Sequence, residues 1–425
     1  MRIGIDCRTI LNVSGGERAG VGHYTYYLVK NLLLVDKKNE YVLFFDSRFK
    51  DIKEFQKYSH VTIKFFPFYQ YKKYLPIIYS QIITSIILNK ENLDLFHSPA
   101  NIVPLYYRRK SVVTLHDLGI YKYPQFFPKK FFNHQLFSKK ILVPSSLKKT
   151  AKIIAVSKNT KKDIIEEFKI PEEKIEVIYE GVLDNKEICA NINSFNDVAQ
   201  KYGINDQFIL FIGTIEPRKN ITNLIKAFRS LRLVYNSPIG DYQLIIAGNQ
   251  GWNDQLIYKA VSDANASILG IKEKRTAVER RHNLDQRLKT ADFLKRRSGQ
   301  ERRQNQPIKY IGYVSHDEKT ALLCKTKCFV FPSFYEGFGL PVLEAMNLGV
   351  PVITSNVSSL PEITGSEGAV LIDPNKESEI VEALQRVVTD KALGDSLITE
   401  GRQRSNYFNW KKCAKETLAV YNSLK

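Results

Sequence analysis

The chain has 425 residues, of which 44% are hydrophobic and 25% charged, a composition typical of a globular protein large enough for two domains with full cores. No apolar run reaches the roughly 20 residues that a membrane-spanning helix needs, and the first residues lack the layout of a signal peptide, so we expect a cytoplasmic protein. The five cysteines are scattered, and Cys324-x3-Cys328 lacks the second pair of a zinc site.

The net charge of +19 is concentrated in two segments. Residues 101–150 carry ten Lys or Arg against one Asp, and residues 267–306 carry twelve against five acidic residues. Between residues 121 and 140, aromatic residues alternate with lysines, a pattern typical of a helix with a core face, a nucleic-acid surface or a membrane-surface helix. Because no nucleic-acid motif accompanies the charge, we expect no nucleic acid and favour anionic lipid as the partner of Lys129, Lys130, Lys139 and Lys140.

The chain begins with a predicted strand over residues 3–6, a polar loop rich in glycine and a helix over residues 24–34. Strand, glycine loop and helix form the layout that cradles a phosphate, but the glycine spacing here is not the dinucleotide fingerprint. A tight turn is the alternative. The two glycines nearest the helix, Gly20 and Gly22, are the candidate site residues of this loop.

The rest of the first half alternates between strands and helices. Three polar residues, His97, His116 and Asp117, stand at strand ends, where open α/β sheets gather their ligands; a satisfied structural histidine is the alternative for either histidine. The apolar run 75–88 predicts a helix on the domain flank, with an interfacial membrane segment as the alternative. The other predicted strands are 41–45, 61–66, 93–99, 112–118, 153–157 and 175–182, with a helix over 159–168 and a linker over 184–206.

The second half restarts with a strand over residues 208–212, which ends at Gly213 and leads through Glu-Pro-Arg-Lys-Asn (216–220) into a helix. Arg218 can fork two oxygens and Lys219 supplies a point charge, so the pair suits a diphosphate; a solvated basic turn is the alternative. The Arg-rich residues 267–306 predict a surface insertion, helical or disordered. The other elements predicted here are strands 242–248, 308–315, 350–354 and 368–373 and helices over 377–389 and from 395 onward.

The stretch 329–346 carries the strongest signal in the chain. A short apolar strand breaks into a glycine loop, and a helix restarts with Pro341 in its first turn. The glycines let backbone N–H groups approach a phosphate at the positive end of this helix. Glu336 and Glu344 bracket the loop, and such paired carboxylates suit the hydroxyls of a sugar and a ribose. Acidic residues that merely complement the helix dipole are the alternative.

In combination and in order, these motifs resemble those of the large retaining glycosyltransferase family four. The Glu-x7-Glu element, the Glu-Pro-Arg-Lys-Asn string and the Leu-His-Asp-Leu string (115–118) carry the resemblance, which covers nearly the whole chain except residues 267–306. It implies an α/β GT-B fold of two doubly wound Rossmann-like domains that face each other across a cleft. Residues 1–190 would form the acceptor side and residues 205–403 would bind the nucleotide sugar, with a helix over 404–425 packing back on the first domain.

The resemblance also implies roles for the site residues. Glu344 would hold the ribose, Glu336 the sugar hydroxyls, and His116 would meet the donor sugar. Arg218 and Lys219 would stabilise the leaving diphosphate. Thr214 stands where many members carry an arginine. The phosphate contact of that arginine is therefore either missing here or supplied from elsewhere. The other expected donor-binding residues are Gly337, Phe338, Gly339, Leu340, Gly213, Gly312 and Val314, and those of the acceptor-side loop are Gly20, Gly22 and Asp117.

The expected activity is transfer of a hexose, with retention, from a nucleotide-diphospho-sugar to a growing, lipid-linked surface polysaccharide at the inner face of the plasma membrane. GDP-mannose is the favoured donor because this subgroup resembles bacterial surface-polysaccharide mannosyltransferases. Neither a cofactor nor a metal is expected, since two basic side chains are present and no Asp-x-Asp element is. The alternatives are a catalytically silent protein of this fold that binds lipid or nucleic acid, and a sugar-nucleotide epimerase.

Overall fold

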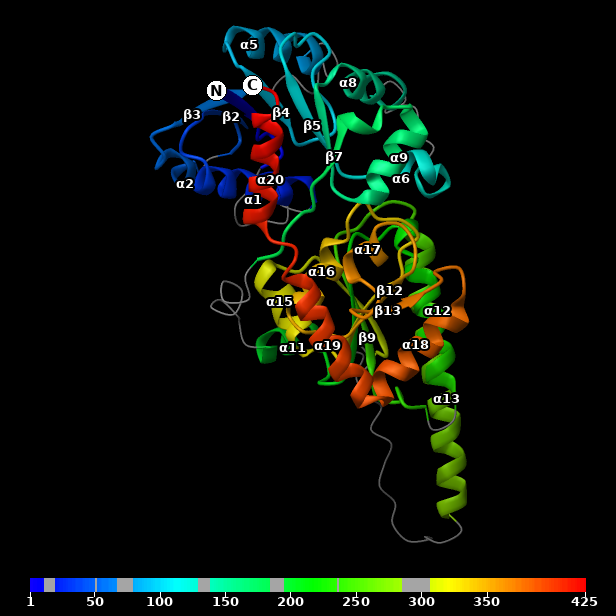
Figure 1. Ribbon diagram of the computed structural model, residues 1–425. Coiled ribbons are helices and arrows are strands. Elements are labelled where there is room, and N and C mark those ends of the chain that lie inside the picture. Colours follow the sequence, from blue (N-terminus) through cyan, green and yellow to red (C-terminus); the bar gives the residue numbers. More distant parts are fainter. Residues whose placement is uncertain are drawn as a thin grey trace. The chain divides into compact units, whose positions relative to one another are not determined.

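The computed structural model describes residues 1–10, 20–49, 52–66, 79–128, 138–183, 195–234, 237–284 and 306–425. Its contacts divide the chain into two compact units (Figure 1). Unit 1 comprises Met1–Asp184, Glu336–Leu340 and Asn406–Lys425, and unit 2 comprises Asn185–Tyr335 and Pro341–Ser405. The Glu336–Leu340 loop therefore belongs to unit 1, although the chain on either side of it belongs to unit 2.

Unit 1 is built on a parallel sheet of seven strands in the order β3-β2-β1-β4-β5-β6-β7. Two of its central strands, β4 and β5, are buried along their whole length, as expected for parallel strands covered on both faces. The strand order reverses between β1 and β4, and open α/β sheets bind ligands at such a switch point. The strands are β1 (Arg2–Asp6), β2 (Glu40–Asp46), β3 (Val61–Phe66), β4 (Leu95–Ser98), β5 (Ser111–Leu115), β6 (Lys152–Ala155) and β7 (Ile175–Val177).

The helices of unit 1 differ from the predicted ones mainly at their ends. The first helix begins at Val21, three residues earlier than predicted, and α9 begins after the predicted capping serine, Ser157, whose side chain accepts from the N–H of Thr160. The described part of the apolar run 75–88 forms a π-helical turn followed by α5. The helices are α1 (Val21–Val35), α2 (Lys53–Gln56), η2 (Tyr79–Ile83), α5 (Thr84–Lys90), α6 (Gly119–Lys122), η3 (Pro124–Phe126), η4 (Ser138–Leu142), α8 (Val143–Lys149), α9 (Lys158–Phe168), η5 (Glu172–Lys174) and α20 (Trp410–Asn422).

Unit 2 is built on a second parallel sheet, of six strands in the order β10-β9-β8-β11-β12-β13. Its order reverses between β8 and β11, so the loops after these two strands meet at the switch point of this unit. Those are the two loops that carry the strongest motifs of the sequence. The strands are β8 (Phe208–Ile212), β9 (Gln243–Ala247), β10 (Ile308–Gly312), β11 (Cys328–Phe331), β12 (Val352–Ser355) and β13 (Val370–Ile372).

The helices of unit 2 include one that reaches into the predicted insertion. The helix α13 extends beyond residue 267, where the insertion was predicted to start, and Figure 1 shows it projecting past the sheet; residues 285–305 lie outside the described residues. None of the helices in the described part of the chain is long and apolar enough to cross a membrane. The helices are α11 (Phe195–Tyr202), η6 (Pro217–Lys219), α12 (Ile221–Leu233), α13 (Gln255–Leu284), α15 (His316–Lys325), α16 (Leu340–Asn347), α17 (Leu360–Thr364), α18 (Glu377–Thr389) and α19 (Lys391–Ser405).

Candidate functional site

The predicted diphosphate site lies on the turn after β8, at the switch point of unit 2. Residues 216–220, which we call the basic turn, contain η6, and Asn220 ends this short helix in the left-handed conformation with φ 58°. The side chain of Arg218 is 11% exposed and Lys219 is 8% exposed. The alternative of a solvated basic turn is therefore wrong, because both cations are held against the protein.

The guanidinium of Arg218 is engaged by two neighbouring groups. Its Nη2 donates to Oε1 of Glu216 over 2.6 Å, and its Nη1 donates to the carbonyl oxygen of Tyr335 over 2.6 Å. The carbonyl oxygen of Arg218 accepts from the backbone N–H of Phe334 over 2.9 Å. Arg218 thus ties the basic turn to the chain directly before Glu336, a supporting role that the sequence did not indicate.

Lys219 is held differently from its neighbour. Its Nζ lies 4.8 Å from the ring centroid of Phe331, the last residue of β11. This ring stacks in turn on Phe211 of β8, with the centroids 5.7 Å apart. A cation over an aromatic face is attracted by the ring's electrons and is stabilised there. The ammonium is therefore fixed at the switch point, where a phosphate would benefit from it.

The helix α16 begins as predicted, with Pro341 as its second residue and Glu344 further into the helix. Glu344 is paired with a lysine that the sequence did not single out. Nζ of Lys319, on α15, donates to Oε1 of Glu344 over 2.6 Å, and the two side chains are 21% and 18% exposed. The predicted ribose carboxylate is therefore oriented by a cation on the neighbouring helix.

The Glu336–Leu340 loop packs within unit 1. The carbonyl oxygen of Gly337 accepts from Oγ1 of Thr160 over 3.2 Å, and a Cβ on Gly337 would lie 1.7 Å from the carbonyl oxygen of His116. Phe338 is 5% exposed and contacts the rings of Tyr179 and Phe408. Glycine is thus required at position 337 because the backbone approaches His116 closely, a reason that the phosphate argument alone did not provide.

His116 stands at the end of β5 and is bonded on both sides of its ring. Nδ1 lies 3.2 Å from Oε1 of Glu180, and Nε2 lies 2.8 Å from the carbonyl oxygen of Pro99. The ring of Tyr24 meets it edge-on, with the centroids 4.7 Å apart. The next residue, Asp117, uses Oδ1 to accept from the backbone N–H of Gly119 over 3.1 Å.

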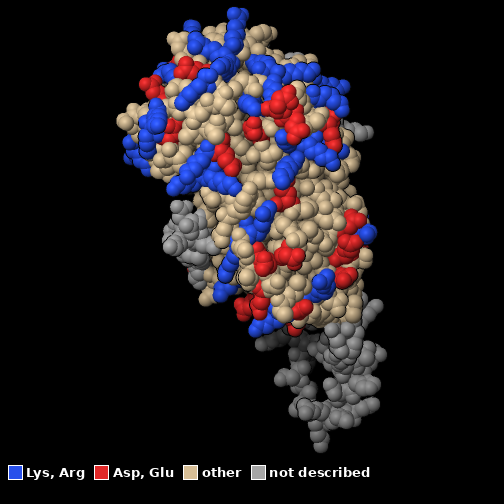
Figure 2. Space-filling model, viewed as in Figure 1, with Lys and Arg blue, Asp and Glu red and all other residues tan. Residues whose placement is uncertain are grey.

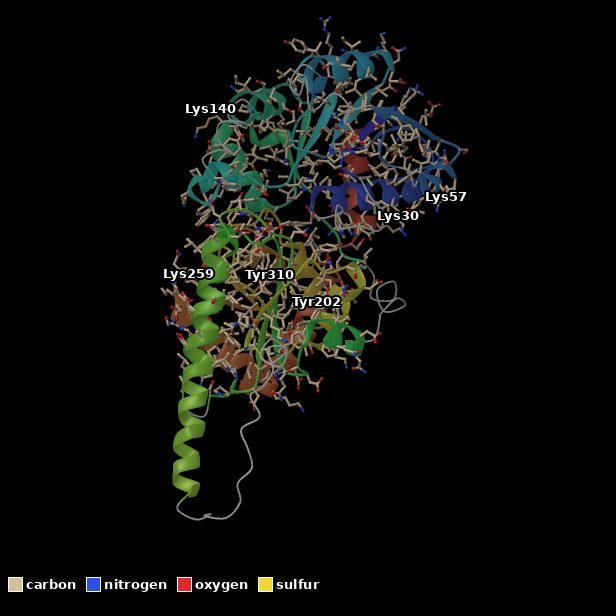
Figure 3. All side chains as sticks on the ribbon, turned by 180° about the vertical axis from the view of Figure 1, so that it is seen from behind. Lys30, Lys57, Lys140, Tyr202, Lys259 and Tyr310 are labelled. Atoms are coloured by element: carbon tan, nitrogen blue, oxygen red, sulfur yellow. The ribbon has the colours of Figure 1, made fainter. Side chains whose placement is uncertain are left out.

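The three strand ends β8, β9 and β10 converge on predicted donor-binding residues. Gly213 follows β8. A Cβ on Gly248, which follows β9, would lie 1.8 Å from the carbonyl oxygen of Gly213. The N–H of Gly248 donates to the carbonyl oxygen of Gly312 over 2.8 Å, and Tyr310 donates its hydroxyl to the carbonyl oxygen of Gly248 over 3.0 Å (Figure 3). Val314 is 7% exposed and packs in the core of unit 2, so only its backbone is available to a ligand.

The acceptor-side glycine loop is described only at its end. Gly20 caps α1 with φ 61°, a conformation that favours glycine, and Gly22 is buried in the first turn of that helix. Residues 11–19, which include the rest of the predicted loop, lie outside the described residues. Within the described ranges, no three His, Cys, Asp or Glu side chains gather as a metal site would require.

Sequence reasoning missed three residues that orient the predicted ones: Glu216, Glu180 and Lys319. Glu216 is 1% exposed. It belongs to the Glu-Pro-Arg-Lys-Asn string, where a carboxylate so close to two cations could have indicated an ion pair. Glu180 follows an apolar strand, where a buried carboxylate needs a cation. Lys319 is one of many lysines, and only the spatial pairing of α15 with α16 reveals it.

Two doubly wound parallel sheets, one with a buried basic turn and a helix N-terminus at its switch point, form the architecture of the glycosyltransferases with the GT-B fold. The comparisons with known proteins support this class. The chain matches the family described as "Glycosyltransferase Family 4" over residues 18–185 and that described as "Glycosyl transferases group 1" over residues 194–275 and 287–404.

Individual relatives agree with the family matches. The O-antigen chain mannosyltransferase B of Escherichia coli is 31% identical over 331 residues, which are 78% of this chain and 74% of that protein. The serotype-specific mannosyltransferase WbdA of Escherichia coli is 30% identical over 267 residues, and the match spans only 27% of that longer protein. Among solved structures, the sucrose-phosphate synthase of Thermosynechococcus elongatus has a TM-score of 0.68 at 18% identity, with 100% of this chain and 98% of that chain covered. WaaG, a glycosyltransferase involved in lipopolysaccharide biosynthesis, has a TM-score of 0.66 at 13% identity, with 98% of this chain and 99% of that chain covered.

The chain belongs to glycosyltransferase family 4 and is a glycosyltransferase that resembles bacterial mannosyltransferases. The predicted family, the predicted GT-B fold class and the predicted enzyme class are confirmed.

Proposed function

We propose that this glycosyltransferase moves mannose, with retention of anomeric configuration, from GDP-mannose to a growing, lipid-linked surface polysaccharide. The observation that carries the donor class is the buried basic turn at the switch point of unit 2, where the ammonium of Lys219 is held over the ring of Phe331. The preference for mannose and for a polysaccharide acceptor is supported by the relative named as an O-antigen chain mannosyltransferase.

In the proposed reaction, the bond between the sugar and the diphosphate breaks and negative charge grows on the leaving group. Lys219 stabilises that charge, assisted by Arg218 and by backbone N–H groups at the start of α16. Glu344 accepts from the ribose hydroxyls, with Lys319 fixing its orientation. Glu336 accepts from the sugar hydroxyls and His116 contributes to the sugar site. We assign no enzyme nucleophile, so the acceptor hydroxyl attacks from the face that the diphosphate leaves and its proton passes to the departing diphosphate oxygen, and no metal takes part.

A donor panel with product analysis tests this function. The purified protein is incubated with GDP-mannose, UDP-glucose and UDP-galactose, each with and without a lipid-linked oligosaccharide acceptor. We expect an acceptor lengthened only with GDP-mannose, and an α-anomeric linkage by NMR. A β-linked product contradicts retention. Release of an epimerised sugar nucleotide without acceptor identifies an epimerase, and binding without turnover of any donor identifies a silent relative.

We further propose that unit 1 docks reversibly on an anionic membrane. Of the four lysines first singled out, Lys129 and Lys130 lie outside the described residues, as does the side chain of Lys139, whereas Lys140 is exposed and points outward (Figure 3). The described residues show a mixed surface around the loop before β5. Four exposed apolar side chains, on η2, α5, this loop and η4, are Ile82, Ile86, Tyr106 and Ile141.

These apolar side chains are brought together by the loop. The N–H of Leu105 donates to Oε1 of Gln81 on η2, and Nζ of Lys149 on α8 donates to the carbonyl oxygens of Pro104 and Tyr107. Exposed basic residues surround them, and Figure 2 shows Lys and Arg gathered over the part of unit 1 where α5 and α8 lie. Anionic lipid attracts basic side chains by about 1 kcal/mol for each charge near the surface. We call this surface, with Lys90, Arg108, Lys140 and Lys148, the lipid face.

Sedimentation with vesicles tests the lipid face. We expect salt-sensitive binding to vesicles that contain phosphatidylglycerol and little binding to phosphatidylcholine alone, because the attraction is screened by salt. Replacing Arg108, Lys140 and Lys148 together by Glu should abolish sedimentation. The matched control reverses three exposed lysines near α2, Lys38, Lys53 and Lys57, of which Lys57 lies on the side of unit 1 away from Lys140 (Figure 3). Equal loss in both variants means that net charge alone acts and contradicts a specific face.

A further inference from the structure

Two ionisable side chains from separate parts of unit 1 meet in its interior. His116 follows β5 and Glu180 lies after β7, and the pair is joined by the 3.2 Å contact between Nδ1 and Oε1. The side chains are 11% and 5% exposed. The backbone of His116 is also fixed, because its N–H donates to Oδ1 of Asn101 over 3.1 Å. The ring therefore has one defined position.

The partners of the ring decide how many protons it carries. A backbone carbonyl can only accept a hydrogen bond, so Nε2 of His116 must donate to Pro99. An ionised carboxylate can also only accept, so Nδ1 must donate to Glu180. A ring with both N–H groups is an imidazolium. The other oxygen of Glu180, Oε2, is buried with no hydrogen-bond partner in the described part of the chain. A carboxylate buried in this way needs a neighbouring positive charge.

Three ionisable groups near the pair, Tyr24, Cys413 and His97, are neutral. Burial raises the pKa of the Tyr24 phenol and of the Cys413 thiol well above their ordinary values, so both stay neutral. Burial first, and the charge of His116 second, lower the pKa of His97 to about 3, so it is neutral too. Two ionisable side chains of α20, Lys412 and Glu416, line the small cavity beside Glu180, and burial raises the pKa of the Glu416 carboxyl.

We propose that Glu180 and His116 form a buried carboxylate–imidazolium pair that positions the Glu336–Leu340 loop. Both ring nitrogens of His116 bond to groups of unit 1. His116 therefore acts by holding the Glu336–Leu340 loop in position and not by donating a free N–H to a ligand. Its carbonyl oxygen is the atom against which Gly337 packs, so a shift of the ring and its peptide is passed directly to the loop that carries Glu336. Glu180 is a positioning residue in this arrangement, and the consequence for activity rests on the proposed function.

Side-chain NMR tests the pair without reference to activity. In long-range ¹H–¹⁵N spectra of the full-length protein at pH 7.5, with the His116→Gln variant for assignment, we expect both nitrogens of His116 to show imidazolium shifts. In Glu180→Gln, whose side-chain amide can donate to Nδ1, we expect a neutral ring protonated on Nε2. A neutral His116 in the wild-type protein at pH 7.5 overturns the proposal, whether or not the Glu180→Gln variant folds.

Kinetics test the positioning role. Glu180→Gln should lower kcat by roughly tenfold to a hundredfold, the range for losing a group that orients a functional histidine, with KM for the donor changed less than kcat. Glu416→Gln, a half-buried carboxylate on α20, is the matched control and should leave kcat unchanged. Equal effects of the two variants contradict a specific pair. Wild-type turnover in His116→Gln, with the imidazolium still seen in the unmodified protein, removes His116 from the proposed site but leaves the ion pair standing.

Discussion

At the scale of single residues, the adjacent cations of the basic turn have different surroundings, so replacing them should have different effects on activity and stability. Lys219→Ala removes a charge held over Phe331, and we expect kcat to fall by roughly 10²-fold with little loss of stability, since stabilising a developing charge is worth that much. Arg218→Ala should cost a similar factor and also lower the free energy of unfolding by about 3 kcal/mol, because Glu216 loses a buried cation. Steady-state kinetics measures the change in kcat, and urea unfolding measures the change in the free energy of unfolding.

The control for this pair is the conservative exchange. Arg218→Lys keeps the charge but cannot span Glu216 and the Tyr335 carbonyl as a planar fork does, so it should recover less activity than Lys219→Arg. Wild-type kinetics in the Arg218→Ala, Lys219→Ala double variant refutes the assignment of both residues.

The two glutamates of the Glu-x7-Glu element should separate binding from turnover. Glu344→Gln is expected mainly to weaken nucleotide affinity, because a ribose hydrogen bond is present both before and during the reaction. Glu336→Gln is expected to lower turnover more than affinity, since its contact aligns the reacting sugar. Calorimetric titration of GDP together with kcat distinguishes them, and the reverse pattern exchanges the two roles. Lys319→Met should mimic Glu344→Gln if the ion pair orients that carboxylate.

At the scale of elements, α20 is tied to the sheet of unit 1 by a histidine that cannot become charged. Nδ1 of His97 on β4 lies 2.6 Å from the Tyr421 hydroxyl, and Nε2 lies 2.9 Å from Oγ1 of Thr114. Because the pKa of His97 is lowered to about 3, the unfolded chain takes up a proton near pH 6.5 and the folded chain does not. Lowering the pH from 7 to 5 should therefore cost about 2 kcal/mol of stability.

Urea unfolding across this pH range measures the effect. His97→Gln should flatten the slope of stability against pH, whatever it does to stability at pH 7. His316→Gln, which alters an exposed histidine on α15, should leave the slope as it is. An unchanged slope in His97→Gln shows that other groups carry the acid sensitivity.

Two glycines, one in a loop and one inside a helix, should respond oppositely to alanine. At Gly337 the new Cβ would meet the backbone of His116, which cannot move aside, so we expect a loss of about 3 kcal/mol and of activity. At Gly394, inside α19, nothing lies within 4 Å of the new Cβ, and alanine should stabilise the helix by about 0.5–1 kcal/mol. Thermal unfolding of the two variants checks the contrast, and a stable Gly337→Ala protein contradicts the close approach.

At the scale of the whole molecule, sequence predicted the strands and the family better than it predicted contacts. Strands β8 and β11 are short apolar runs bounded by turn residues, and the local sequence is enough to predict such strands. The basic turn and the start of α16 were placed correctly for the same reason. The partners of Arg218, Glu344 and His116 were missed, because Tyr335, Lys319 and Glu180 come from other elements. The first turn of α1 was also missed, since the helix begins among glycines.

The division of the chain has a consequence for how the protein is made. Residues 406–425, which complete unit 1, are translated only after every residue of unit 2. On the ribosome, the sheet of unit 2, whose last strand ends at Ile372, can emerge while unit 1 still lacks α20 and the hydroxyl partner of His97. A force-sensitive arrest peptide placed at successive lengths should report folding of unit 2 before that of unit 1, the reverse of the order in which the two units begin. During that interval the incomplete unit 1 exposes the surface of α1 that α20 later covers.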